Sequence, residues 1–366
     1  MKEFRVYMNN LQDIERELAF WNTEKLKITH PLRQLFWECT LNCNLSCKHC
    51  GSDCKKDSRI AEMPLADFIP VLDDIKKHQP NIKTMVYTIG GEPLVRHDIL
   101  DCGRAITDRG FYWGTVTNGH ILDRTLMKEL MRAGLRSISV DIDGMKDSHN
   151  WLRNNSQSFD RAFNALTCIR DTPLLAWDVI TCVHRRNFSE LDSIKAMLIE
   201  AGVKRWRCFT ITPMGRAKEN EELILSNDEF KMLMEFIVKT REEGKIKLSY
   251  GCEGYLGEYE GKVRDHQYSC RAGLTVASIL NDGGISGCLS IRSDYQQGNI
   301  YTDNFWDVWN ERFMIYRNRE WMRTDQCETC EVFKYCQGNG MHLRDGKGKL
   351  MLCHYHKLHN TTHSIL

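Results

Sequence analysis

Short apolar runs alternate with longer stretches of helical periodicity between residues 31 and 215, and the alternation repeats six times. Runs of this length that are rich in β-branched and aromatic residues predict buried strands. The predicted strands are 35–40, 84–89, 112–117, 137–142, 176–183 and 205–211. Strands separated by helices form right-handed βαβ units and a parallel sheet. Six units do not close an eight-stranded barrel, so the predicted fold class is α/β, either a partial (β/α)6 TIM-like barrel or a doubly wound sheet.

The regions before and after this alternation differ from it in pattern. Residues 1–30 predict a strand at 4–8 and a helix at 11–21, which we interpret as an N-terminal packing extension. Residues 216–250 carry one long amphipathic helix, interpreted as a linker. Residues 251–366 are rich in glycine and cysteine and form a loop-rich C-terminal domain with a tail. A region so poor in regular structure needs metal or covalent cross-links to hold it together.

Composition narrows the function classes. The 366-residue chain has 42% hydrophobic and 27% charged residues, which is typical of a soluble protein of two or three domains. A net charge of +1 gives no reason to expect nucleic acid or an anionic membrane as a partner. No apolar run approaches the roughly 18 residues of a membrane span, and the charged start of the chain is unlike a secretory signal. We therefore expect a cytoplasmic protein, whose 16 cysteines indicate metal or redox chemistry rather than disulfides.

The densest cysteine pattern comes directly after the first predicted strand. Cys43, Cys47 and Cys50 form a C-x3-C-x2-C loop. Iron–sulfur clusters are bound through cysteine sulfur, and three thiolates hold three corners of a four-iron cluster while one iron stays open to a ligand that is not protein. A zinc site and a set of buried, inert thiols are the two alternatives for an isolated triplet.

Chemically useful residues also follow the other predicted strands. Ligands of parallel α/β folds gather at the carboxyl ends of the strands. Here those ends carry Gly90-Gly91-Glu92-Pro93, Asn118, Asp141, Asp143 and the run 213–217. Paired glycines let the backbone approach a ligand closely, and a glutamate accepts hydrogen bonds from an ammonium group. Each of these residues equally fits a plain turn, a helix cap or a solvated charge.

The cysteine triplet and the downstream Gly90-Gly91-Glu92-Pro93 together resemble the motifs of the radical SAM enzymes. The resemblance implies a [4Fe–4S] cluster on the triplet, with S-adenosylmethionine on its open iron. The further contacts that it implies are the tetrapeptide for the methionine amino group, Asn118 beside it, Asp141 and Asp143 for the ribose, Arg153 for the carboxylate and His49 near the adenine. Many relatives carry serine in place of Asp141, and packing is the alternative role for His49.

The C-terminal cysteines resemble a second module of the same superfamily, the SPASM domain. Cys270, Gly283 and Cys288 are followed by a C-x2-C-x5-C run and a late cysteine. The resemblance implies that one auxiliary [4Fe–4S] cluster is held completely, by Cys327, Cys330, Cys336 and Cys353. The spacing alone also permits a four-cysteine zinc ribbon.

The first auxiliary site departs from the SPASM pattern. The cysteines available to it are Cys252, Cys270 and Cys288. Gly340 stands where relatives usually supply one more cysteine. Three outcomes stay open: an open iron, a substitute ligand such as His342, or an empty site. Sulfatase-maturing relatives use an aspartate directly after the cysteine that matches Cys288, and Leu289 at that position weighs against their activity.

The remaining cysteines and the histidines near the end of the chain are assigned no chemistry. Six cysteines fall mostly in predicted strands or helices and are interpreted as packing residues: Cys39, Cys54, Cys102, Cys168, Cys182 and Cys208. Four histidines are interpreted as part of a polar chain end: His354, His356, His359 and His363.

The resemblance to radical SAM enzymes with a SPASM domain implies a chemistry and a set of partners. Reductive cleavage of S-adenosylmethionine gives a 5′-deoxyadenosyl radical, which abstracts hydrogen from substrate. Relatives mostly modify peptides or proteins, so we expect a peptide or protein substrate that is oxidised or cross-linked, with a flavodoxin- or ferredoxin-like electron donor. The alternatives are modification of a tetrapyrrole or other small molecule and, outside enzymes, a zinc-stabilised binding module.

Overall fold

A single curved sheet organises the chain. The computed structural model describes residues 11–251, 253–291 and 295–359. Within these residues the sheet has ten strands, in the order β10-β9-β8-β1-β2-β3-β4-β5-β6-β7. The six predicted strands all form, with ends within two residues of those expected: β1 (Gln34–Thr40), β2 (Met85–Gly90), β3 (Tyr112–Thr117), β4 (Leu135–Asp141), β5 (Ala176–Val183) and β6 (Arg205–Thr210). They are parallel and adjacent in sequence order, which confirms the partial barrel, because a doubly wound sheet reverses its order at a switch point.

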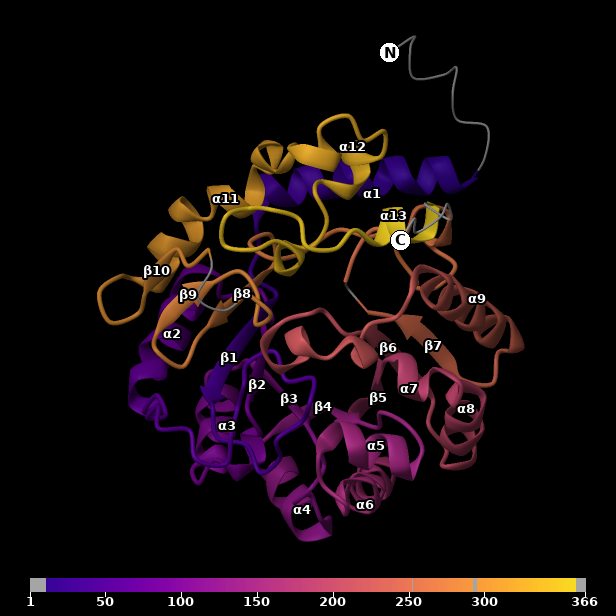
Figure 1. The fold of residues 1–366 in the computed structure, drawn as a ribbon. Helices are drawn as coiled ribbons and strands as arrows, with labels where there is room; N and C mark the ends of the chain where they lie inside the picture. The colour runs from indigo at the N-terminus through magenta and orange to yellow at the C-terminus, as the bar shows by residue number, and fades with distance from the viewer. Residues whose placement is uncertain (1–10, 252, 292–294, 360–366) are drawn as a thin grey trace.

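Helices between the strands cover the outer side of the sheet (Figure 1). They are α2 (Leu65–His78), α3 (Ile99–Asp108), α4 (Arg124–Arg132), α5 (Lys146–Arg153), α6 (Ser158–Arg170), α7 (Arg185–Phe188), α8 (Leu191–Glu200) and α9 (Asn227–Glu243). Strand residues that point toward them are fully buried. Trp37 stacks on Phe68 of α2 with 4.0 Å between ring centroids, and Trp206 meets Phe236 of α9 edge to face. The main hydrophobic core therefore lies between the sheet and its helices.

The inner face of the sheet is lined differently. Residues that alternate with the buried outward ones, such as Phe36, Tyr87 and Arg207, keep part of their surface exposed. Phe36 and Tyr87 stack at 5.4 Å on the β1–β2 side, whereas Arg207 pairs with Asp178 and donates to Ser139 at 3.0 Å across β4, β5 and β6. The inner side of the partial barrel, its lumen, thus has one aromatic wall and one charged wall.

Four short strands extend the sheet beyond the predicted six. The strand β7 (Lys247–Tyr250) pairs parallel with β6, so the segment expected to be a linker ends in a seventh β/α unit. At the other edge, β8 (Val276–Ile279) pairs parallel with β1, and β9 (Gly284–Ser286) and β10 (Gly298–Asn299) follow antiparallel. Strands of two to four residues are too short for periodicity in the sequence to reveal them.

The N-terminal helix is longer than expected and packs on the C-terminal domain. The helix α1 (Leu11–Thr29) lies beside α12 (Phe333–Cys336) in Figure 1, while the strand predicted at 4–8 lies outside the described residues. Its Glu17 accepts hydrogen bonds from Lys334 at 2.6 Å and from the Tyr335 hydroxyl at 2.5 Å. The helix α1 therefore packs against the region around Cys336.

The rest of the C-terminal region is built of short helices. Three more α-helical turns follow the sheet: α10 (Phe305–Asp307), α11 (Met314–Arg317) and α13 (His354–His359). Tighter or wider single turns along the described part of the chain are η2 (Pro93–Val95), η3 (Gly215–Glu219), η4 (Glu221–Leu223), η5 (Gly257–Tyr259), η6 (Val308–Arg312), η7 (Glu320–Met322), η8 (Asp325–Cys327) and η9 (Met341–Leu343). A helix capable of crossing a bilayer is not found among the described residues.

One of the tail histidines is not part of a polar chain end. His354 begins α13 and is 1% exposed, with its ring 5.2 Å from that of Phe230 and 6.1 Å from that of Tyr250. Both of its ring nitrogens lack a hydrogen-bond partner. The prediction for His354 was therefore wrong, because α13 folds back onto α9 and buries this side chain. His363 lies outside the described residues.

We expect the free energy of unfolding of His354→Phe to fall less steeply than that of the wild type as the pH drops below 6.5. Burial first, and then nearby cationic groups, hold the pKa of His354 well below its ordinary 6.5. The unfolded state consequently binds a proton that the folded state refuses, so the stability from His354 is present above pH 6.5 and falls as the pH drops. The loss approaches about 1.4 kcal/mol per pH unit for one such group. Denaturant unfolding at pH 5, 6 and 8 measures it. His97→Phe, at an exposed position, is the control, and an unchanged slope in His354→Phe contradicts the prediction.

Candidate active site

The cysteine triplet lies on a loop at the carboxyl edge of the sheet, directly after β1. Cys43 and Cys47 are buried and Cys50 is partly exposed, and the three pack in one apolar cluster. Backbone hydrogen bonds fix the loop at both sides, from Cys43 to the carbonyl of Lys55 at 3.0 Å and from Lys48 to that of Leu152 at 2.8 Å. The three thiols thus lie together in one cluster on this loop.

A segment after β6 clamps this loop from the opposite side. The Arg216 guanidinium donates to the carbonyls of Cys47 at 2.7 Å and Cys54 at 3.0 Å. The Arg216 backbone N–H also donates to the Cys50 carbonyl at 3.1 Å. Gly215 has a φ of +53°, and a Cβ there would lie 2.5 Å from the Cys50 carbonyl oxygen. The sequence placed run 213–217 at a strand end but gave no sign that Arg216 binds the loop.

The glycines after β2 meet protein backbone. A Cβ on Gly90 would lie 2.1 Å from the carbonyl oxygen of Thr40, and one on Gly91 would lie 2.1 Å from that of Asn42. Gly91 and Glu92 donate through their N–H groups to the same two carbonyls, at 2.8 and 2.9 Å. Both glycines therefore allow β2 to press against the chain that leads into Cys43, a role distinct from the expected approach to a ligand.

Glu92 is an acceptor held next to the triplet. Its side chain is 1% exposed and accepts hydrogen bonds from the Thr117 hydroxyl and the Asn118 N–H, each at 2.8 Å. It also caps the short turn η2, which Pro93 begins. Burial raises the pKa of Glu92 to about 7. The Asn118 amide lies 3.9 Å from the Cys43 sulfur, so this strand end and the cysteine loop share one site.

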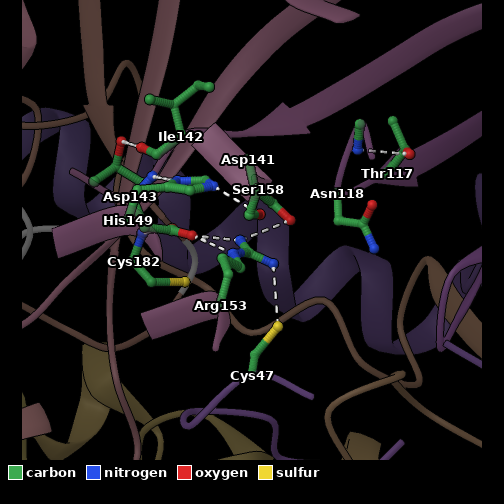
Figure 2. Close-up of polar contacts among 12 residues, drawn as sticks. Cys47, Thr117, Asn118, Asp141, Ile142, Asp143, His149, Arg153, Ser158 and Cys182 are labelled. Carbon is green, nitrogen blue, oxygen red and sulfur yellow. Dashed lines mark hydrogen bonds and ion pairs between the residues drawn. The ribbon is translucent and has the colours of Figure 1, made fainter. Parts of the chain in front are cut away.

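Arg153 is the centre of the charged part of the site (Figure 2). It contacts Asp143 at 2.5 Å, Asp141 at 3.0 Å and the Cys47 sulfur at 3.8 Å. Asp143 is fully buried and also accepts a hydrogen bond from the Cys182 N–H at 2.9 Å. Although burial opposes its charge, Arg153 and nearby histidines lower the pKa of Asp143 to about 2. Burial raises the pKa of Asp141, which is partly exposed, to about 6.

These contacts change the role expected of Asp143. We expected both aspartates to bind ribose hydroxyls, but Asp143 has no exposed surface and its oxygens already accept from Arg153 and a backbone N–H. It instead fixes Arg153 in position. Two neutral histidines border the pair: burial lowers the pKa of His49 to about 3 and that of His149 to about 4. His149 accepts from the Asp143 N–H at 3.0 Å and so holds the backbone at this strand end.

The chemistry of the loop fits a metal cluster bound through sulfur. Burial raises the pKa of Cys43 to about 12, so this thiol keeps its proton until a metal replaces it. A hydrogen bond with Cys54 lowers the pKa of Cys50 to about 5. Cys54 is buried as predicted, and it also contacts Cys50 through this hydrogen bond. N–H donors of Asn118 and Arg153 face two of the sulfurs, as the second shell of such a site requires.

The second cysteine set surrounds a cavity in the C-terminal domain. Its four sulfur residues line the same space: Cys327, Cys330, Cys336 and Cys353. Arg344 lies 3.4 Å from the Cys327 sulfur. Among the described residues no three ligating side chains meet closely enough to hold one metal ion. Four thiols around one cavity form a donor set for a metal or cluster bound through sulfur.

Two of the three cysteines expected at the first auxiliary site are among the described residues. Cys252 lies outside the described residues, while Cys270 and Cys288 are both present and partly exposed. Burial raises the pKa of Cys270, but Arg319 and the N–H groups of Met341 and Ala272 lower it by more, so the net shift is downward. Burial lowers the pKa of His342 to about 4, so its imidazole is neutral at pH 7.

Two family models match separate parts of the chain. The Radical SAM superfamily model matches residues 37–198, and the model of SPASM, an iron-sulfur cluster-binding domain, matches residues 270–331. An AdoMet-dependent heme synthase of Methanosarcina barkeri is 26% identical over 86% of this chain and 92% of that protein. The mycofactocin maturase MftC of Mycolicibacterium smegmatis is 26% identical over 84% and 77% of the two chains. Among solved structures, anSMEcpe with bound AdoMet has a TM-score of 0.69 at 18% identity, over 90% of this chain and 91% of that one.

Proposed function

Because the chain belongs to the radical SAM superfamily and carries a SPASM domain, we propose that this enzyme is a maturase that removes hydrogen from a side chain of a peptide or protein. When bound, the [4Fe–4S] cluster and S-adenosylmethionine supply reductive cleavage of the sulfonium and a 5′-deoxyadenosyl radical. Cys43, Cys47 and Cys50 would hold the cluster. Glu92 is buried and already accepts hydrogen bonds from Thr117 and Asn118, so it would hold the strand ends in place beside the cofactor. A flavodoxin- or ferredoxin-like protein delivers the electron.

The charged residues at the mouth of the barrel serve to position the cofactor. Arg153 holds a positive charge beside Cys47, and Asp143 keeps it there by accepting a hydrogen bond from Arg153 Nε at 2.6 Å and forming an ion pair with the same guanidinium. Asp141, on the exposed side of the same arginine, is the carboxylate that remains available to ribose hydroxyls. The lumen behind them receives the substrate and keeps bulk water from the reacting centre.

The preference for a peptide substrate rests on two ion pairs, Arg153 with Asp143 and Arg207 with Asp178. Asp141 faces two guanidinium groups, and both are already neutralised: Arg153 by Asp143 and Arg207 by Asp178. A tetrapyrrole brings several carboxylates, which need compensating cations when they leave water. An uncharged peptide segment with an apolar side chain needs none and can pack on the Phe36–Tyr87 wall. A mycofactocin maturase among the relatives supports the same choice.

Modification of a tetrapyrrole is the second candidate. Its support is the heme synthase of Methanosarcina barkeri, which this chain matches over 92% of that protein's length. The experiment that separates the two is anaerobic reconstitution with S-adenosylmethionine and dithionite, followed by mass spectrometry. One arm contains peptides encoded next to the gene and the other iron coproporphyrin. A mass loss of about two hydrogen atoms or a cross-link in a peptide supports maturation, whereas turnover of the porphyrin alone overturns it.

We expect Cys47→Ala to abolish reductive cleavage of S-adenosylmethionine. Without this sulfur the cluster loses one of its three protein ligands and the Arg153 contact loses its partner. Wild-type protein reduced with dithionite should yield 5′-deoxyadenosine by chromatography and contain about eight or more atoms each of iron and sulfide. Cys102→Ala, which removes a buried sulfur of α3, is the control and should keep both. Product from Cys47→Ala at the wild-type rate, or zinc in place of iron, would remove the assignment of the triplet.

A further inference from the structure

Arg344 is a buried cation that contacts one sulfur of the second cysteine set. The residue is 3% exposed, and its Nη2 donates to the Cys327 sulfur at 3.4 Å. In the part of the chain that the structure describes, no carboxylate pairs with this guanidinium. A buried charge is costly unless an opposite charge compensates it, and a sulfur bound to metal as thiolate carries one. The contact with Cys327 thus indicates an anionic group in the cavity that the four thiols surround.

Three backbone carbonyls fix the Arg344 guanidinium in place. It donates to the carbonyls of Met322 at 3.1 Å, Gly338 at 3.1 Å and Gly348 at 2.7 Å. These three carbonyls lie in the segments that lead to or from three of the four cysteines of the set. The protein itself therefore holds the cation beside the cavity, and its position does not depend on a bound group.

One of these carbonyls is presented by an uncommon backbone turn. Gln337, Gly338 and Asn339 all have a positive φ, at 51°, 78° and 74°. Such values are unfavourable for residues other than glycine, so contacts elsewhere have to stabilise the turn. A Cβ on Gly338 would lie 2.6 Å from Cβ of Met322 and 3.2 Å from Nη2 of Arg344. Glycine at position 338 therefore leaves the space that the guanidinium occupies.

From these contacts we infer that Arg344 raises the reduction potential of the auxiliary cluster on the second cysteine set. Reduction adds one negative charge to a cluster, and a fixed guanidinium beside it stabilises that charge, because water screens a buried site little. The hydrogen bond to the Cys327 sulfur acts in the same direction. The reduced state of the cluster is thereby favoured, as an electron acceptor requires. The inference rests on the proposed function, because it needs the auxiliary cluster of a SPASM enzyme.

The test uses a full-length background in which the other two cysteine sets are disabled: Cys43→Ala, Cys47→Ala, Cys270→Ala and Cys288→Ala. A redox titration of the reconstituted protein, followed by EPR, then reports the second set alone. Arg344→Gln should reduce the ratio of reduced to oxidised cluster at a fixed potential at least tenfold, which is about 59 mV for a one-electron couple. Arg344→Lys loses the same planar fork but keeps the charge, so it should shift the potential much less. Equal shifts in both variants, or an unshifted potential in Arg344→Gln, overturn the role of the charge.

Arg323→Gln is the matched control for the loss of a nearby charge. This guanidinium lies 5.2 Å from the centre of the Phe333 ring, which lines the same cavity. The side chain is exposed, however, and within the described residues it contacts no sulfur. Water screens a charge in this position, so the potential should stay nearly unchanged. A shift as large as that of Arg344→Gln would contradict a specific role of Arg344.

A second measurement decides if neither Arg344 variant folds. The background protein, grown with arginine labelled with ¹⁵N in its guanidinium group, should show a ¹⁵N coupling to the reduced cluster by ENDOR. Absence of this coupling, or zinc in place of a four-iron cluster, overturns the inference. Formation of 5′-deoxyadenosine by the protein with its intact triplet tests the proposed function separately, so the failure of one is distinguishable from the failure of the other.

Discussion

Replacing Arg153 with methionine should lower the free energy of unfolding by about 3–5 kcal/mol, because it leaves the buried carboxylate of Asp143 without its partner. Asp143 is fully buried, and Arg153 supplies two of the contacts to its carboxylate. Methionine fills much of the volume of the arginine, so the change tests charge more than packing. Urea unfolding at pH 7 measures the difference.

The pH dependence of the same variant identifies the carboxylate. Wild-type stability from Asp143 is fully present above its ordinary pKa of 3.8 and is lost as the pH falls toward 2. In Arg153→Met this acid loss should disappear, since the depressed pKa depends on the arginine. Adding Asp143→Asn should recover part of the stability at pH 7. Arg104→Met, which breaks the exposed pair with Asp101, is the matched control and should leave the unfolding midpoint nearly unchanged. An equal, small effect of both arginine variants would argue against a buried ion pair.

The second large effect is expected for Gly91→Ala, which should lower the iron content that the reconstituted protein binds at Cys43, Cys47 and Cys50. A methyl group at this position would lie 2.1 Å from the Asn42 carbonyl oxygen, and the chain from Asn42 leads directly into Cys43. Overpacking of this kind usually costs about 1–3 kcal/mol, and here the backbone has to move rather than a flexible side chain. Iron content and the visible spectrum after reconstitution measure the loss.

Gly51→Ala is the matched control for this substitution. It lies in the same cysteine loop, but a Cβ on Gly51 would have no heavy atom within 4 Å. The variant should therefore reconstitute like the wild type. If Gly91→Ala also binds its iron normally, the close contact between β2 and Asn42 is not what holds the loop.

The sequence predicted those parts of the molecule that have a repeating signal. The strands of the barrel are long enough for their apolar runs to stand out, and β3 and β5 begin and end at the predicted residues. The triplet has a spacing of its own, and the rule that ligands follow strand ends singled out Glu92 and Asn118, which lie beside it in the structure. Both kinds of signal are local, so they do not depend on how distant segments pack.

The parts that could not be predicted depend on contacts between distant segments. Arg216 is 169 residues from Cys47, whose carbonyl it binds, and no sequence pattern near either residue predicts this contact. Asp143 looks like any carboxylate until the fold buries it against Arg153. His354 sits in a polar stretch of sequence and is buried only because α13 packs on α9. Such residues show why a site motif identifies the chemistry better than it identifies the residues that support it.

The pairing of β8 with β1 has a consequence for how the molecule can be divided. β1 delivers the cysteine loop, and its other edge is covered by a strand that the C-terminal region contributes. A chain cut after residue 250 would leave β1 as an exposed edge strand, with unpaired N–H and C=O groups open to intermolecular pairing. The barrel and the cysteine-rich region are therefore better regarded as one cooperative folding unit than as two separable modules.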